Sequence, residues 1–252
     1  MDCLFFISQN KKKLKIFLHI KIKSILFWRI IMQTKRKRDH NGESVVHSFL
    51  CKYFYELFPK CETIINKKEQ IAGIDEKCMI DGEWVSIDEK TQLTRLDQDI
   101  TPYTTQCIEL MSKNRNGVYN KGWINNTLTD CYLFTYIINC KTKDPEKLVD
   151  SNQIEKMRAV LISKKNIQKM FEENGFSLKD LNQDAYALLN GTFHRETGTH
   201  QYFDLNKNMW LCLSKANWLA ETPVNAIIRW FLYEDYAWHV YNITPSYIEI
   251  IK

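Results

Sequence analysis

The chain of 252 residues contains only eight glycines and five prolines, and this scarcity excludes several kinds of site. No glycine-rich loop that would cradle a phosphate is present, and no Gly-x-Ser-x-Gly turn occurs that would expose a serine nucleophile. None of the eight cysteines forms a Cys-x-x-Cys pair, so their spacing gives little support to a structural zinc site. A chain of this length can build a core without disulfides. We therefore expect reduced thiols and a cytoplasmic protein.

The chain also lacks a long uncharged apolar span. Residues 14–31 are hydrophobic, but they are interrupted by four basic residues: Lys15, Lys21, Lys23 and Arg29. We therefore predict no integral membrane segment, although a helix that lies on a membrane surface stays a weaker alternative. A polar stretch opens at Met32, which indicates that residues 1–31 precede the true start of the protein.

Basic charge is concentrated at the N-terminus. Residues 1–40 hold eleven Lys and Arg against two acidic residues, whereas the remaining residues hold 24 basic and 28 acidic ones. The division predicts a basic tail over 1–40 and a single domain over 41–252. The basic run at the end of this tail is suited to contact with phosphate groups. The alternatives are a nuclear localisation signal and a solvated tail without a partner. That run consists of Lys35, Arg36, Lys37 and Arg38.

Hydrophobic periodicity in the body predicts an α/β (α+β) domain with a mixed central β-sheet flanked by helices. A helix is expected after Ser44, ending before Pro59, followed by strands within 63–93. The stretch up to Asn116 is ambiguous between helix and strand. The apolar run 130–140 is typical of a strand buried on both faces. The further elements expected are a strand over 156–163, helices over 163–175 and 177–190, and mostly strands beyond 192.

A hairpin is predicted around Asp81-Gly82, because this dipeptide suits a type I′ turn between alternating runs. If the two residues form the loop, Ile80 pairs with Glu83, and Asp75 then falls directly opposite Asp88. Strand alternation puts Lys90 and Gln92 on the same face as Asp88. The other face carries apolar residues and is expected to pack on the core.

Two opposed carboxylates destabilise a strand pair unless positive charge lies between them. A divalent cation supplies that charge, and a lysine beside it orients water and offsets charge on a phosphoryl group. The alternative is an exposed polar hairpin face, on which Lys77 and Lys90 neutralise the aspartates. Periodicity alone leaves both interpretations open.

The segments "GID" at 73–75 and "IDEK" at 87–90 resemble the motif of the PD-(D/E)XK nuclease superfamily, which has the restriction-endonuclease-like fold. Asp75 matches the first acid, Asp88 the second and Lys90 the lysine. The family core, a helix, a three-stranded meander, a helix and a strand, is similar to the elements expected within 43–139. The chain departs from the pattern at Ile74, where many members have proline. Residues 141–252 form a strand-rich extension without a counterpart.

The resemblance implies a nuclease that hydrolyses phosphodiester bonds, with DNA favoured over RNA as substrate and Mg²⁺ or Mn²⁺ as cofactor. It implies that Asp75 and Asp88 bind the metal and Lys90 acts on the attacking water. Glu43 looks like the additional acid of some members, and Gln92 like the polar residue that follows the lysine in others. A non-catalytic binding or protein-interaction domain on the same fold is the alternative, and a homodimer is open.

A chain that begins at Met32 is expected to fold with the melting temperature of the full chain, because the periodic pattern starts only after Asn41. Circular dichroism melts of both chains measure this. A large fall in melting temperature after truncation would contradict it.

Overall fold

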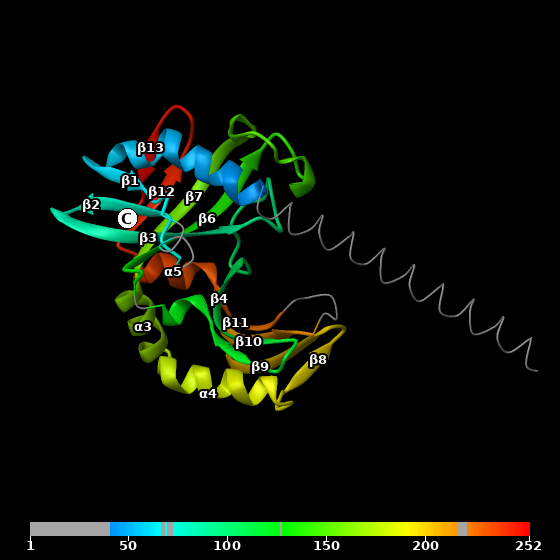
Figure 1. Ribbon diagram of the computed structural model, residues 1–252. Coiled ribbons are helices and arrows are strands. Elements are labelled where there is room, and N and C mark those ends of the chain that lie inside the picture. Colours follow the sequence, from blue (N-terminus) through cyan, green and yellow to red (C-terminus); the bar gives the residue numbers. More distant parts are fainter. Residues whose placement is uncertain (1–40, 67–68, 70–72, 127, 216–220) are drawn as a thin grey trace, which may run out of the picture. The chain divides into compact units, whose positions relative to one another are not determined.

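A computed structural model describes residues 41–66, 69, 73–126, 128–215 and 221–252 (Figure 1). Residues Asn41–Lys252 form one compact unit. The predicted basic run Lys35–Arg38 and the start at Met32 lie outside the described residues. The mixed α+β class is confirmed, and the described strands form two sheets.

The first sheet has seven strands in the order β1-β2-β3-β6-β7-β12-β13. All neighbours are antiparallel except β3 and β6, which run parallel, so this sheet is mixed as expected. Its strands are β1 (Cys61–Thr63), β2 (Glu76–Ile80), β3 (Glu83–Gln92), β6 (Cys131–Cys140), β7 (Ile154–Ser163), β12 (His239–Ile243) and β13 (Ile248–Ile250).

The second sheet is antiparallel and has six strands in the order β5-β4-β11-β10-β9-β8. It contains β4 (Thr105–Asn114), β5 (Tyr119–Lys121), β8 (Arg195–Thr197), β9 (His200–Asn206), β10 (Met209–Ser214) and β11 (Glu221–Arg229). The stretch that was ambiguous in sequence is therefore strand β4. The chain leaves the first sheet after β3, forms β4 and β5 in the second sheet, and returns to the first sheet only at β6. Parallel neighbours require such a long crossover connection.

Helices cover both sheets. The predicted amphipathic helix spans residues 41–53, and Ser163 and Ser177 cap the next two helices through their side chains. The labelled helices are α3 (Lys164–Glu173), α4 (Leu178–Leu189) and α5 (Trp230–Tyr236), with single 3₁₀ turns η1 (Tyr55–Leu57), η2 (Trp123–Asn125), η3 (Pro145–Lys147) and η4 (Ser151–Gln153). Helix α5 falls within a stretch expected to be mostly strand. None of the helices in the described ranges is long and apolar enough to cross a membrane.

Alternate residues of β6 serve two separate cores, as its continuous apolar run predicted. Leu133 and Ile137 pack with Val46 and Phe49 of the helix over 41–53. Phe134, on the other face, packs in the second core, which holds residues of β4, β11, α3 and α4. The first sheet therefore lies between that helix on one side and the second sheet with its helices on the other (Figure 1).

The expectation that all cysteines are reduced is wrong for two of them. Cys61 and Cys78 form a disulfide across β1 and β2. They are direct partners in the strand register, with Cα atoms 4.1 Å apart, and this pairing brings their side chains together. The sequence did not reveal it because β1 was expected further along the chain. Five other described cysteines are free: Cys51, Cys107, Cys131, Cys140 and Cys212.

Gly122 yields a prediction about packing. A Cβ atom at this position would lie 2.2 Å from the backbone oxygen of Glu109, and backbone cannot move aside as a side chain can. Gly122→Ala should therefore cost more than about 2 kcal/mol of unfolding free energy, as severe overpacking does.

Gly42→Ala is the matched control for that experiment. The three atoms nearest to its added Cβ all belong to the Leu93 side chain, with the terminal Cδ1 closest at 2.7 Å, and Gly42 lies in a helix. Urea denaturation of both variants provides the measurement. Equal stabilities would show that the contact of Gly122 with β4 is not tight.

Candidate active site

The β2–β3 hairpin has the predicted turn and register. Asp81 and Gly82 have φ values of 50° and 85°, the positive values that a type I′ turn requires. Ile80 pairs with Glu83, and Glu76 pairs with Ile87. Asp75 lies one residue before β2, and its backbone N–H donates to the oxygen of Ile87 at 2.9 Å. Asp75 and Asp88 therefore occupy opposed positions.

The Asp88 carboxylate is buried, with 2% of the residue exposed. Lys90 donates a hydrogen bond to Oδ1, whereas Oδ2 is buried without a hydrogen-bond partner among the described residues. Gly73 lies directly against this oxygen, because a Cβ on Gly73 would come within 3.1 Å of it. Burial raises the pKa of Asp88 to about 7; the Lys90 ammonium opposes the shift and the Asp75 carboxylate adds to it.

Asp75 is half-buried, and its Oδ2 accepts a hydrogen bond of 2.8 Å from the backbone N–H of Glu89. The carboxylate thus points across the hairpin toward β3, beside Asp88. The Asp75 and Asp88 carboxylates lie next to each other, and one Asp88 oxygen, Oδ2, has no hydrogen-bond partner among the described residues. Such oxygen ligands suit a hard divalent cation such as Mg²⁺ or Mn²⁺. The residues present fit the cofactor expected from sequence.

Lys90 lies on the same face of β3 as Asp88, and its side chain is 25% exposed. Its ammonium lies 5.2 Å from the ring centre of Trp123, in a cation–π contact. Lys77, which the alternative interpretation assigned to the aspartates, instead pairs with Glu69 at 2.7 Å. Lys90 is therefore the hairpin lysine whose ion pair goes to the aspartates.

Two further predicted residues lie apart from this group. Gln92 is partly buried near the end of β3, and its Oε1 has no hydrogen-bond partner among the described residues. Glu43 is exposed in the helix over 41–53, and its neighbour Gly42 lies against Leu93. That helix packs on the face of the first sheet opposite to Asp88. The structure brings Asp75, Asp88 and Lys90 together, while Glu43 lies near the end of β3.

Sequence reasoning missed Glu109, which comes from β4 of the second sheet. Burial raises the pKa of Glu109, the nearby charge of Glu221 adds to the shift, and the Lys90 ammonium lowers it. The Lys90 charge therefore acts on carboxylates from both sheets, Asp88 and Glu109. Glu109 lies in the stretch whose secondary structure was ambiguous, so no strand face could be assigned to it.

The opposite face of the hairpin carries a second polar group that sequence reasoning also missed. Glu76 and Glu89, the neighbours of Asp75 and Asp88 in the chain, point toward the helix over 41–53. His47 on that helix hydrogen-bonds Glu89 at 2.9 Å. Hydrogen bonds with Cys51 and then Glu89 raise the pKa of His47 to about 11. Each strand of the hairpin therefore presents acidic residues on both faces.

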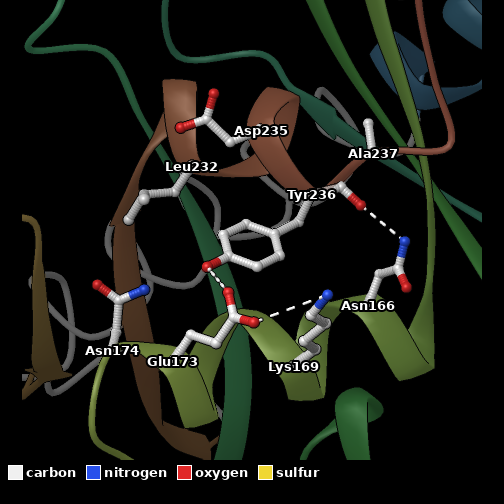
Figure 2. Close-up of a pocket in the computed structure, with 8 residues that line it drawn as sticks. All are labelled: Asn166, Lys169, Glu173, Asn174, Leu232, Asp235, Tyr236 and Ala237. Atoms are coloured by element: carbon white, nitrogen blue, oxygen red, sulfur yellow. Dashed lines mark hydrogen bonds and ion pairs between the residues drawn. The ribbon is translucent and has the colours of Figure 1, made fainter.

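A pocket elsewhere in the described residues includes none of these groups. It is lined by residues of α3 and α5 and the segments that follow them (Figure 2). Tyr236 donates to Glu173 at 2.5 Å and Lys169 pairs with the same carboxylate at 3.7 Å, so its charged groups largely satisfy one another. We assign no chemistry to this pocket.

No protein-family model, no curated protein and no solved structure matches this chain. Function is therefore inferred from the geometry of the hairpin and from the resemblance of its motif.

Asp88→Asn tests the opposed carboxylates through stability. The folded pKa of Asp88 is about 7 against an ordinary 3.8, so between these values the folded protein binds more protons than the unfolded chain. The unfolding free energy of the metal-free parent should therefore decrease as the pH rises from about 4 to about 7. The part of this decrease that comes from Asp88 should be absent in the variant. Melting temperatures across this pH range measure the difference.

The same variant should respond less to metal. Mg²⁺ or Mn²⁺ should raise the melting temperature of the parent, by an effect of about 2.7 kcal/mol at a hundred times the dissociation constant. Asp88→Asn should lose most of this rise, whereas Asp204→Asn, which removes an exposed partner of Arg195, should keep it. A less stable Asp88→Asn protein with an unchanged metal response would make Asp88 a structural partner of Lys90.

Proposed function

We propose that this protein is a metal-dependent nuclease that hydrolyses phosphodiester bonds, with DNA favoured over RNA. The observation that carries the proposal is the pair of adjacent carboxylates, Asp75 and Asp88, with Lys90 bound to the buried one. Burial and mutual repulsion disfavour two such charges unless cations compensate them. A single partly exposed lysine does so incompletely, since the pKa of Asp88 stays raised.

Each side chain has a distinct part in the proposed reaction. Asp75 and Asp88 would hold Mg²⁺ or Mn²⁺, which would supply Lewis acidity toward the phosphoryl group and the attacking water. Lys90 orients the attacking water and offsets the charge that develops on the phosphoryl oxygens. Gln92 lies further along the same face of β3, where it can orient the water or the substrate. The water-mediated metal contact expected of Glu43 is left out of the proposed reaction, because its helix packs on the face of the sheet opposite to Asp88.

The order of elements supports a restriction-endonuclease-like core in part. A helix, the meander β1-β2-β3 and the strand β6 follow one another, with Asp75 directly before β2 and Asp88 on β3, similar to the PD-(D/E)XK pattern. The segment for which the resemblance implies a second helix instead supplies strands β4 and β5 to the second sheet. The core proposed here is therefore a variant whose crossover passes through an added antiparallel sheet.

The partner proposed is nucleic acid, and the basic run Lys35, Arg36, Lys37 and Arg38 supplies sequence-independent phosphate contacts. Cleavage of plasmid, single-stranded DNA and RNA, each with Mg²⁺, with Mn²⁺ and with EDTA, tests the activity and ranks the substrates. Metal-dependent cleavage of any of them that EDTA abolishes supports the proposal. Absence of cleavage throughout would contradict it.

The second candidate is a non-catalytic binding domain on the same fold. The direct Lys90–Asp88 ion pair favours it, because this contact gives the buried carboxylate a partner without any metal. Under this reading the protein binds nucleic acid in EDTA as well as in Mg²⁺ and leaves it intact.

Lys90→Ala separates the two candidates. Removing a preorganised cation from a phosphoryl-transfer site should lower the cleavage rate at saturating substrate by about 10²–10³-fold. The metal-induced rise in melting temperature should persist, because both aspartates remain. Single-turnover cleavage and thermal melts measure the two effects separately.

Lys169→Ala is the matched control for that variant. Lys169 is an exposed lysine that also pairs with a carboxylate, in α3, and its loss should leave the cleavage rate unchanged. If Lys90→Ala cleaves as fast as the parent in Mg²⁺, Lys90 has no catalytic role.

A further inference from the structure

Three side chains that commonly bind transition metals meet beneath the helix over residues 41–53. His47 and Cys51 are four residues apart and therefore lie on one face of this helix. Glu76, on β2, faces them from the first sheet. The ligand atoms, one from each side chain, all lie within 4.8 Å of one another.

The separations of these atoms approach those of a tetrahedral zinc site. With ordinary Zn–S, Zn–N and Zn–O bond lengths, tetrahedral geometry places S and N roughly 3.5 Å apart, N and O roughly 3.4 Å, and S and O roughly 3.6 Å. Cys51 Sγ lies 3.4 Å from His47 Nε2. Glu76 Oε1 lies 3.8 Å from His47 Nε2 and 3.9 Å from Cys51 Sγ. Shifts of a few tenths of an ångström would complete the triangle.

The outer contacts of the cluster also match a metal site. His47 Nδ1, the ring nitrogen that faces away from Cys51, lies 2.9 Å from Glu89 Oε1. Tyr55 donates to the same oxygen at 2.7 Å. A carboxylate behind the second nitrogen of a histidine ligand fixes the ring orientation and strengthens the ligand. The Glu76 and Glu89 side chains are only 2% and 9% exposed, so two carboxylates share this buried space with one histidine.

We propose that His47, Cys51 and Glu76 bind one Zn²⁺ ion, with Glu89 as the carboxylate that orients His47. A thiolate and an imidazole in the ligand set select zinc over the magnesium expected at Asp75 and Asp88. Cys61, which also lies near Glu76, is bonded to Cys78 and is not counted as a ligand. The His47 side chain is 32% exposed, so water completes the tetrahedron from the solvent side.

The zinc site goes beyond the proposed nuclease centre and is separate from it. Its ligand Glu76 and its supporting residue Glu89 are the chain neighbours of Asp75 and Asp88, but they point to the other face of the hairpin. A zinc ion there ties the helix to the hairpin and thereby fixes the position of both aspartates from behind.

Zinc and cobalt titrations of the full chain test the site. The protein is first stripped of metal with a chelator under anaerobic conditions and without a thiol reductant, so that the Cys61–Cys78 disulfide stays intact, and the Asp88→Asn background removes the magnesium site from the measurement. We expect Zn²⁺ to bind and to raise the melting temperature. Co²⁺ in its place should give an absorption band from thiolate-to-cobalt charge transfer, which aspartate ligands cannot produce.

Variants locate the ion. Cys51→Ser should abolish the charge-transfer band, and His47→Gln should remove the zinc-induced rise in melting temperature. Glu89→Gln should lower zinc affinity about 10–100-fold while the band persists, because it acts through His47. Cys107→Ser, a change at an exposed free cysteine, and His200→Ala, in the β8–β9 hairpin, are matched controls that should retain both signals.

The result that overturns the proposal is an Asp88→Asn protein without the charge-transfer band, or one whose band survives the further change Cys51→Ser. The cluster would then be an ion-paired network that holds the helix without metal. Because all measurements work in the Asp88→Asn background, an inactive magnesium centre leaves them unaffected, and the two proposals fail or stand independently.

Discussion

The register of the β2–β3 hairpin is the constraint on which the rest of the site depends. The turn at Asp81-Gly82 fixes which residues face each other, and strand alternation then assigns every side chain to one of two surfaces. A shift by one residue would send the Asp88 carboxylate into the apolar core beneath the helix over 41–53. The same shift would carry Ile87 to the polar face. Core packing of Cys78, Val85 and Ile87 therefore enforces the juxtaposition of the carboxylates.

Charge distribution on this hairpin is unusual for a strand pair. Asp75 and Glu76, and likewise Asp88 and Glu89, are successive acids that point to opposite faces, so acidic groups lie on both sides of one two-stranded layer. Lys90 compensates on one side and His47 on the other. Each buried carboxylate lowers stability by itself, and buried charges in proteins are paired with opposite charges or bind metal ions. Both proposed metal sites contain such buried carboxylates, Asp88 in one and Glu76 in the other.

Local patterns were enough to predict the hairpin, the capped helices α3 and α4 and the doubly buried strand β6, because each depends on residues close together in the chain. The pairing of Asp75 with Asp88 followed from the turn alone. Glu109 and the cluster around His47 could not be predicted, because they depend on which elements pack together across long separations. The Cys61–Cys78 disulfide was missed because β1 is only three residues long and carries no clear alternation.

Each of the two sheets combines strands from the first half of the chain with strands from the second half, and this affects how the protein folds. Strand β4 pairs with β11, which lies about a hundred residues later in the chain. In the first sheet, β7 and β12 likewise extend the sheet that begins with β1 to β3. Contacts between such distant segments are reached only after large losses of chain entropy, and proteins that depend on them fold slowly. Neither half of the chain holds a complete sheet. Translation must therefore have passed β11 before the second sheet can close, and β12 and β13 before the first sheet can close.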